Sequence, residues 1–194
     1  MGAFGLVIKL FALLIGVCLG QQRYTVQQAF EVHEVVPDVV SYPPRSMLEV
    51  CYPTGFRLMF GNTACPSQLK EAPTVMWRAN PYRYYTLIVA DPDAPSRIAP
   101  EDREWLHWLV INIPGANLAA GETVFDYLPP GPPPKTGLHR YVFLVYEQPS
   151  RICFNGPREF KNRGKFSAEQ FAAQNGLGIA YAGNFFLTQN ESNP

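Results

Sequence analysis

Three nearly continuous apolar runs dominate the central and C-terminal parts of the chain. They are Tyr84–Ala90, Trp108–Ile113 and Tyr141–Tyr146. Runs of this kind are typical of strands that are covered on both faces, and the first is rich in aromatic and β-branched residues. Shorter extended segments are predicted at Ser46–Tyr52, Phe56–Phe60 and Pro73–Trp77. The pattern therefore predicts a mostly β protein.

One convincing helix signal begins near Ser167. Ser167 and Gln170 have the spacing of a capping box, in which the hydroxyl and the amide satisfy each other's backbone donors. Phe171 supplies an apolar face, and Gly176 offers a C-terminal stop. We expect few helices in this fold.

The first twenty residues have the pattern of a signal peptide. Leu10 to Leu19 is an unbroken apolar segment, about the length of a signal-peptide hydrophobic region and too short to span a bilayer alone. Cys18 and Gly20 are small enough for a cleavage site. We predict a signal peptide at 1–20 and a single domain at 21–194, secreted and extracellular; the alternative is an uncleaved membrane anchor.

Charge gives little indication of partners. The chain carries 16 basic and 16 acidic residues without a long run of one sign, so no nucleic-acid surface is indicated. Cleavage would leave Cys51, Cys65 and Cys153, which allow at most one internal disulfide. Cys51 and Cys65 flank a segment that reads as a hairpin, so they are the expected pair.

Polar and aromatic side chains stand at the ends of the three long apolar runs. Residues two apart on a strand face the same side, and this spacing relates three pairs: Asp91 and Asp93, Trp105 and His107, and His139 and Tyr141. If the three strands are neighbours, these side chains converge on one patch. Prolines stiffen the loop after Asp91, and glycines leave backbone N–H groups of the 131–137 loop approachable.

Two imidazoles beside two carboxylates fit several chemistries. They could ligate a metal, form a general acid–base pair, or bind an anion while the carboxylates fix the imidazole tautomers. The structural alternative is an Asx turn at each aspartate and satisfied core histidines. Coincidence of three clusters favours a site over three separate structural roles.

Three segments resemble the signatures of the phosphatidylethanolamine-binding protein family. They are Asp91-Pro-Asp-Ala-Pro-Ser-Arg97, Arg103-Glu-Trp-Leu-His107 and Gly131-Pro-Pro…Gly137-Leu-His-Arg-Tyr141, within a likeness that runs from about Leu48 to Phe186. The resemblance implies a β-sandwich-like fold with a large central antiparallel sheet, a small second sheet and few helices. It also implies a small pocket for phosphate, acetate or a phosphorylethanolamine head group, and a cis bond at Ala94-Pro95.

Carried over by position, the resemblance assigns nine residues to the wall of the pocket. They are Asp91, Asp93, Trp105, His107, Gly131, Pro132, Pro133, His139 and Tyr141. His107 and loop N–H groups are expected to face the anion, and Asp91 is expected at the rim, where it could pair with an ammonium. Leu106 stands where many members of the family have a histidine. The 183–194 segment lacks the family's Trp-Asp-Asp-Tyr sequence and the helix that follows it. Because that helix helps to close the pocket, a more open pocket is expected.

The sequence thus predicts a secreted, non-catalytic binding protein for anionic ligands such as phosphatidylethanolamine or phosphorylethanolamine head groups, with peripheral membrane contact as a further partner. The alternative is a protease or kinase inhibitor that acts through the surface around the pocket. An enzyme is disfavoured, because no nucleophile–base spacing or HExxH cluster occurs, and no metal or cofactor is predicted. Asn190-Glu-Ser192 is a glycosylation sequon.

Overall fold

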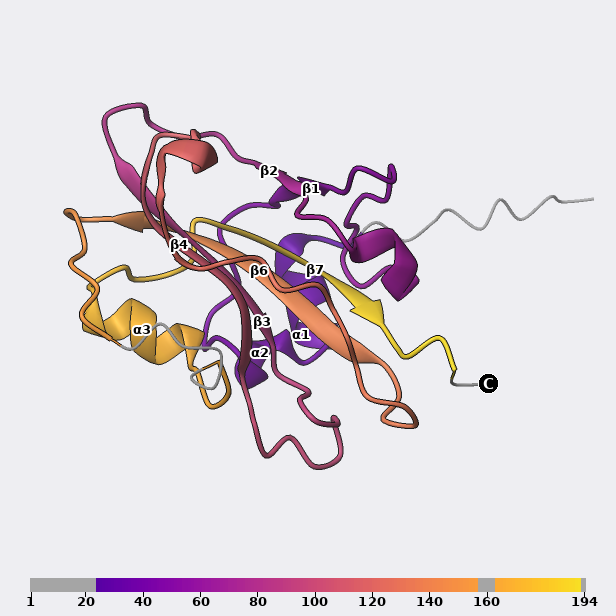
Figure 1. Cartoon of the computed structure of the whole chain (residues 1–194). Helices are drawn as coiled ribbons and strands as arrows, with labels where there is room; N and C mark the ends of the chain where they lie inside the picture. Colours follow the sequence, from indigo (N-terminus) through magenta and orange to yellow (C-terminus); the bar gives the residue numbers. More distant parts are fainter. Residues whose placement is uncertain (1–23, 157–162, 193–194) are drawn as a thin grey trace, which may run out of the picture.

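A five-stranded antiparallel sheet runs through the centre of the molecule (Figure 1). The computed structural model describes residues 24–156 and 163–192, so the predicted signal peptide lies outside the described residues. The strand order is β5-β4-β3-β6-β7, with β3 (Tyr84–Asp91), β4 (Trp105–Pro114), β5 (Glu122–Phe125), β6 (His139–Gln148) and β7 (Ala182–Thr188). A two-stranded sheet pairs β1 (Glu49–Cys51) with β2 (Thr74–Met76). The predicted fold class is confirmed.

The three long apolar runs are the three central strands, and each strand extends beyond its apolar run. β3 continues to Asp91, β4 begins at Trp105 and β6 begins at His139. The polar residues at these ends are therefore held by the ladder itself rather than by flexible loops. The expected strand at 56–60 is wrong, because there only Arg57 forms an isolated bridge, to Cys51. Strands β5 and β7 were not predicted.

The large sheet buries an apolar core on each face. Alternation along β3 places Leu87 and Val89 in the core beneath the small sheet, and Ile88 and Ala90 in the core beneath the helices. All four side chains are at most 1% exposed. Because burial of one aliphatic side chain contributes roughly 1.5–3 kcal/mol, the two cores fix the register of the central strands.

Short helices cover one face of the large sheet. They are α1 (Val26–Val32), α2 (Val35–Asp38) and α3 (Ala168–Gln174), and two 3₁₀ turns occupy Pro66–Leu69 and Leu118–Ala120. The predicted helix is confirmed as α3, with the Ser167 hydroxyl accepting the Gln170 N–H at 3.2 Å. None of the described helices is long and apolar enough to cross a membrane.

A chain segment closes the outer edge of β7. The Gly61 N–H donates to the Phe185 carbonyl, and the Ala64 N–H donates to the Leu187 carbonyl, both at 2.9 Å. Thr63 forms a parallel bridge with Leu187. Segment 61–64 thus takes up main-chain groups that an edge strand would otherwise leave open.

The three described cysteines are free thiols, so the expected Cys51–Cys65 disulfide is wrong for this structure. The residue opposite Cys51 is Arg57, which closes a tight turn well before Cys65 is reached. Cys51 pairs with Thr74 in the small sheet, whereas Cys65 follows the segment that lies along β7. Cys51 therefore lies in the small sheet, whereas Cys65 precedes the 3₁₀ turn at 66–69.

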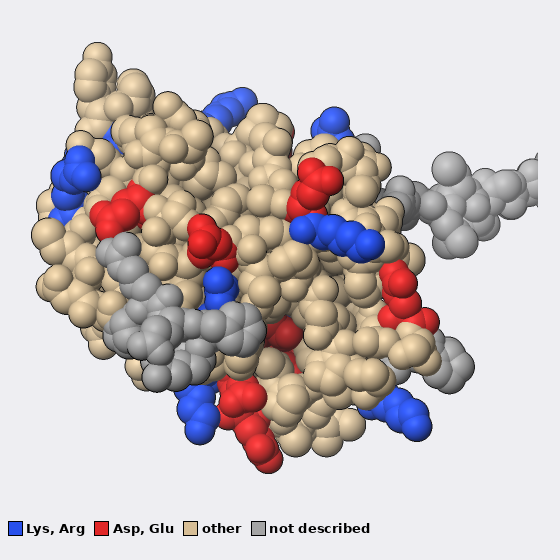
Figure 2. All heavy atoms as spheres, viewed as in Figure 1, with Lys and Arg blue, Asp and Glu red and all other residues tan. Residues whose placement is uncertain are grey.

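Charged side chains are mixed over the face shown in Figure 2. Lys and Arg lie scattered among Asp and Glu, and neither sign gathers into one large patch. A surface of this kind gives no electrostatic footprint for a polyanion on that face.

Candidate functional site

A cavity of about 350 Å³ opens where the ends of β3, β4 and β6 meet. The register brings these ends together, since Asp91 pairs with Trp105 and Ala90 pairs with Val142. The lining consists of Asp91, Ala94, Pro95, Asp102, Trp105, His107, Leu128, Pro129, Gly131, Pro132, Pro133, His139 and Tyr141. The structure therefore gathers all the predicted site residues except Asp93. The Ala94–Pro95 bond is cis, as the family resemblance implied.

Asp93 does not line the cavity, which corrects its assignment to the pocket wall. Strand β3 ends at Asp91, so the alternation of faces does not continue to Asp93. The Asp93 N–H instead turns back to donate to Asp91 Oδ1 at 2.7 Å, and the side chain is fully buried. Burial alone would raise the pKa of Asp93, but the hydrogen bonds and charge of Arg140 outweigh it and hold the pKa below its usual value.

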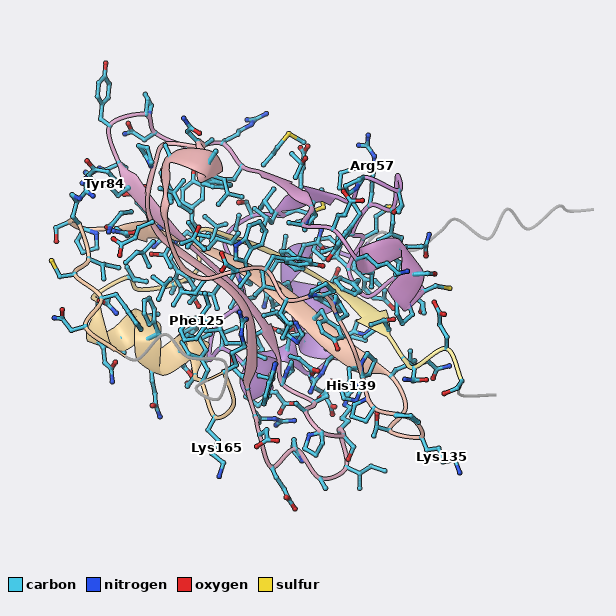
Figure 3. All side chains as sticks on the ribbon, viewed as in Figure 1. Arg57, Tyr84, Phe125, Lys135, His139 and Lys165 are labelled. Atoms are coloured by element: carbon cyan, nitrogen blue, oxygen red, sulfur yellow. The ribbon has the colours of Figure 1, made fainter. Side chains whose placement is uncertain are left out.

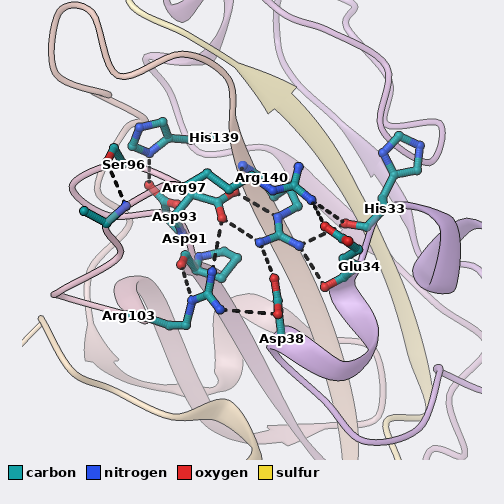
Figure 4. A network of polar contacts seen from close by, with 12 residues as sticks. His33, Glu34, Asp38, Asp91, Asp93, Ser96, Arg97, Arg103, His139 and Arg140 are labelled. Carbon is teal, nitrogen blue, oxygen red and sulfur yellow. Dashed lines mark hydrogen bonds and ion pairs between the residues drawn. The ribbon is translucent and has the colours of Figure 1, made fainter.

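Arg140 is the centre of a buried ion cluster behind the cavity wall (Figure 4). Its backbone N–H and Nε each donate to Asp93 at 2.9 Å, and Nη2 donates to Asp93 at 2.6 Å and to Asp38 at 2.7 Å. Nη1 donates to the carbonyls of His33 and Glu34 at 2.9 and 2.8 Å. The cluster thereby ties the segment that joins α1 and α2 to the start of β6.

Asp91 belongs to the wall of the cavity rather than to its rim. It is 3% exposed, and its Oδ2 lies 2.8 Å from His139 Nδ1. Burial raises the pKa of Tyr141 well above its usual value, and the Asp91 carboxylate that accepts the Tyr141 hydroxyl raises it further. The expectation that Asp91 pairs with a ligand ammonium stays a prediction, and in this structure its oxygens accept from the Asp93 N–H and Tyr141 and contact His139.

Both ring nitrogens of His139 have hydrogen-bond partners. Nδ1 lies 2.8 Å from Asp91 Oδ2, and Nε2 lies 2.9 Å from Thr136 Oγ1. The Thr136 hydroxyl in turn donates to the Pro133 carbonyl at 2.8 Å. This chain of bonds links the Asp91 carboxylate through the imidazole to the proline-rich loop. Figure 3 shows His139 at the base of the loop that carries Lys135, where the loop leads into β6.

His107 contacts a backbone carbonyl rather than a carboxylate. Its Nδ1 donates to the Leu128 carbonyl at 2.7 Å, and its ring packs edge-on against Tyr141 with centroids 4.9 Å apart. Burial lowers the pKa of His107 and outweighs the opposing effect of the bond to Leu128. At neutral pH the ring is therefore uncharged, and Nε2 is an acceptor.

Asp102 is a lining residue that the sequence analysis missed. It is half-buried, and it lies in the irregular segment between β3 and β4, held by a bond from its N–H to the Ala94 carbonyl at 3.1 Å. Strand alternation gives no signal in such a segment. Its carboxylate is the cavity's second, and among the described lining residues there is no Lys or Arg.

The proline-rich loop supplies few donors to the cavity. Pro129, Pro132 and Pro133 have no N–H, and the Gly131 N–H is used by the Tyr141 oxygen. The loop N–H groups that were expected to face an anion are thus largely missing from this wall. Within the described ranges, no group of three or more His, Cys, Asp or Glu residues is placed to hold a metal ion.

A family model and two curated relatives match this chain over most of its length. The model of the phosphatidylethanolamine-binding protein family matches residues 54–186. A protein from Drosophila melanogaster described as putative odorant-binding protein A5 is 34% identical over 180 residues, 89% of this chain and 86% of that protein. The 26 kDa secreted antigen of Toxocara canis is 42% identical over 161 residues; these cover 80% of this chain and 61% of the antigen's length.

Solved structures agree with the sequence matches. The solution structure of the protein CG7054 is 38% identical, with a TM-score of 0.64 over 80% of this chain and 91% of its own. Carboxypeptidase Y inhibitor, in complex with its cognate proteinase, superposes with a TM-score of 0.76 at 23% identity, covering 88% of this chain and 98% of the inhibitor. That second likeness concerns the fold alone. On the sequence and family-model matches, this chain belongs to the phosphatidylethanolamine-binding protein family.

Proposed function

We propose that this chain is a secreted, non-catalytic binding protein for small phosphate ligands that also carry an ammonium group, such as the phosphorylethanolamine head group of phosphatidylethanolamine. The observation that carries the proposal is the charge of the cavity wall. Two carboxylates, Asp91 and Asp102, line it beside two imidazoles, and no Lys or Arg is among its lining residues in residues 24–156 and 163–192. A wall of this kind favours a ligand that brings its own cation over a bare anion.

The two ends of such a ligand have different partners. The half-buried Asp102 carboxylate is available for the ammonium, whereas Asp91 is occupied by His139 and the Asp93 N–H. The neutral His107 ring can accept a hydrogen bond from a singly protonated phosphate. Alternatively, the ring can take the proton from the phosphate and pair with the resulting dianion. Trp105 and the prolines form the apolar sides.

Secretion is part of the proposal. It is supported by the signal-peptide pattern of the first twenty residues and by the description of the Toxocara canis relative as a secreted antigen. An inhibitory role is not carried over, because the likeness to the carboxypeptidase Y inhibitor lies at 23% identity and concerns the fold.

Titration calorimetry with phosphorylethanolamine, inorganic phosphate and ethanolamine tests the head-group proposal. We expect phosphorylethanolamine to bind most tightly. Asp102→Asn should weaken its binding about tenfold, which corresponds to roughly 1.4 kcal/mol, and should leave phosphate binding nearly unchanged. Glu101→Gln is the matched control, because Glu101 is exposed, adjacent and outside the lining. Equal affinity for phosphate and phosphorylethanolamine, unaltered by Asp102→Asn, would sink the proposal.

A further inference from the structure

The segment after β7 runs past the proline-rich loop of the pocket and contacts it. β7 ends at Thr188, which pairs with His139 on β6. Two residues later, Asn190 Nδ2 donates to the carbonyl of Pro132 at 3.0 Å, and Pro132 lines the cavity. Figure 1 shows this yellow segment beside the orange loop. The side chain of Asn190 thus lies directly behind one wall of the pocket.

The same asparagine begins the sequon Asn190-Glu-Ser192, and the structure holds the sequon in a tight turn. The Ser192 N–H and hydroxyl both donate to Asn190 Oδ1, the former at 3.0 Å. Glu191 accepts the Ser67 N–H at 3.0 Å, which fixes the segment against the 3₁₀ turn at 66–69. Asn190 is half-buried, while Glu191 and Ser192 are exposed. The acceptor amide is therefore placed at the pocket wall with its sequon serine open to solvent.

We propose that Asn190 is an N-glycosylation site beside the wall of the pocket, and that its glycan keeps this part of the surface away from a lipid bilayer while free head groups still enter the cavity. The proposal rests on the proposed secretion and on the proposed head-group ligand. In the secretory pathway the sugar comes from a lipid-diphosphate oligosaccharide. The bond from sugar C1 to the diphosphate oxygen breaks, a bond from C1 to Nδ2 forms, and Nδ2 loses one of its two protons as the lipid diphosphate departs.

The size and polarity of the glycan would keep it, and the pocket wall beside it, out of a bilayer. The glycosylated amide keeps one N–H for Pro132, so the first sugar begins within hydrogen-bond reach of a residue that lines the cavity. A glycan is bulky and hydrated, and it cannot enter the apolar part of a membrane. A soluble head group needs only the cavity of about 350 Å³ and can pass beside it.

Exposed apolar side chains on the loops that border the cavity suit a membrane surface. On the loop between β3 and β4, Ile98 is 98% exposed, and Leu138, just before β6, is 41% exposed. Both belong to loops that carry lining residues of the cavity, Pro95 on the first and Pro133 on the second. Exposed apolar side chains on such loops can enter the interfacial region of a bilayer. The glycosylated protein would thus bind the free head group only, whereas the protein without a glycan would also bind the same head group in a membrane.

The test compares the full chain secreted from eukaryotic cells with three variants. Ser192→Ala removes the sequon and keeps the Asn190 amide, Ser192→Thr keeps both, and Asn190→Ala removes both. Intact mass reports the glycan. Binding is measured to phosphorylethanolamine, and to vesicles of phosphatidylcholine with and without phosphatidylethanolamine.

We expect a glycan on the wild type and on Ser192→Thr only. Phosphorylethanolamine affinity should agree within about twofold between the wild type and Ser192→Ala, whereas vesicle binding should be at least about tenfold stronger for Ser192→Ala. A wild type without glycan, or equal vesicle binding by both, would overturn the inference.

Amide hydrogen exchange over residues 131–138 separates this inference from the proposed function, because it needs no ligand. Exchange should be faster in Asn190→Ala than in Ser192→Ala, since only the former loses the bond to Pro132. If no form binds phosphorylethanolamine, the head-group proposal fails, while glycan mass and exchange still decide whether Asn190 is modified and anchors the loop. Equal exchange in the two variants would contradict the anchoring role.

Discussion

Asp91 and Asp93 stand two residues apart in one motif, yet they serve different parts of the molecule. Asp93 is fully buried and saturated by Arg140, which is also fully buried. Asp91 lies at the wall of the cavity and is paired with His139. An arginine is always charged, so Asp93 forms a permanent ion pair, whereas the partner of Asp91 is an imidazole that also lines the cavity. The partner therefore decides which carboxylate holds the fold and which one shapes the site.

The largest effect is expected at the ion cluster. Asp93→Asn leaves Arg140 buried with reduced compensation, and breaking such a pair costs roughly 3–5 kcal/mol of the free energy of unfolding. Urea denaturation followed by circular dichroism measures the loss. The double variant Asp93→Asn with Arg140→Met should recover part of it, because it removes the unpaired charge as well. A loss below about 1 kcal/mol in the single variant would show that Asp93 is not an essential anchor.

A smaller loss of stability and a larger loss of binding are expected at the cavity wall. Asp91→Asn keeps the shape of the side chain but removes the charge that faces His139 Nδ1. We expect about 1–3 kcal/mol of destabilisation together with weakened phosphorylethanolamine binding. The same urea titration and calorimetry measure both quantities. If Asp91→Asn and Asp93→Asn lost stability equally and bound ligand equally, the division between the two carboxylates would be wrong.

The smallest effect is a pH dependence at His107. Burial lowers its pKa below the usual value of 6.5, so the unfolded chain binds this proton more readily than the folded one. Stability contributed by the neutral ring is therefore present above pH 6.5 and is lost as pH falls below it. A bound phosphate reverses the preference, because it stabilises the charged ring.

Phosphate affinity should accordingly rise as the pH falls from 7.5 to 5.5, on the order of a few-fold. His107→Gln should flatten this rise, and calorimetry at several pH values measures it. Because free phosphate also titrates in this range, methylphosphonate or another phosphonate with a different pKa serves as the comparison ligand. A pH profile that is identical in the wild type and in His107→Gln would contradict the role of His107.

The apolar pattern was enough to predict the central sheet but not its edge. Strand β7 was missed because Asn184 interrupts it, although this side chain is fully buried. Its Nδ2 donates to the Leu48 and Leu58 carbonyls, and its Oδ1 accepts the Phe60 N–H. These bonds join β7 to segments more than a hundred residues away. A polar residue that is satisfied by distant backbone looks like a loop residue in the sequence alone.

The candidate site was predictable where strands carry it. His107, His139 and Tyr141 line the cavity, and each lies on a strand whose alternation follows from its apolar neighbours. Asp93 and Asp102 were misplaced or missed because both lie beyond strand ends, where turns set the direction of a side chain. The resemblance to the family added the proline-rich loop and the cis bond at Ala94, which periodicity does not indicate.

The segment that covers β7 also bears on how copies of this protein meet. A sheet with an open outer strand can recruit the matching strand of a second molecule and grow into larger assemblies. Here the groups of Phe185 and Leu187 that point outward are already bonded to segment 61–64. Growth of the sheet from the β7 side would first require that segment to detach. The fold thus protects an aromatic, aggregation-prone strand, Ala182–Thr188, without placing a single charge on it.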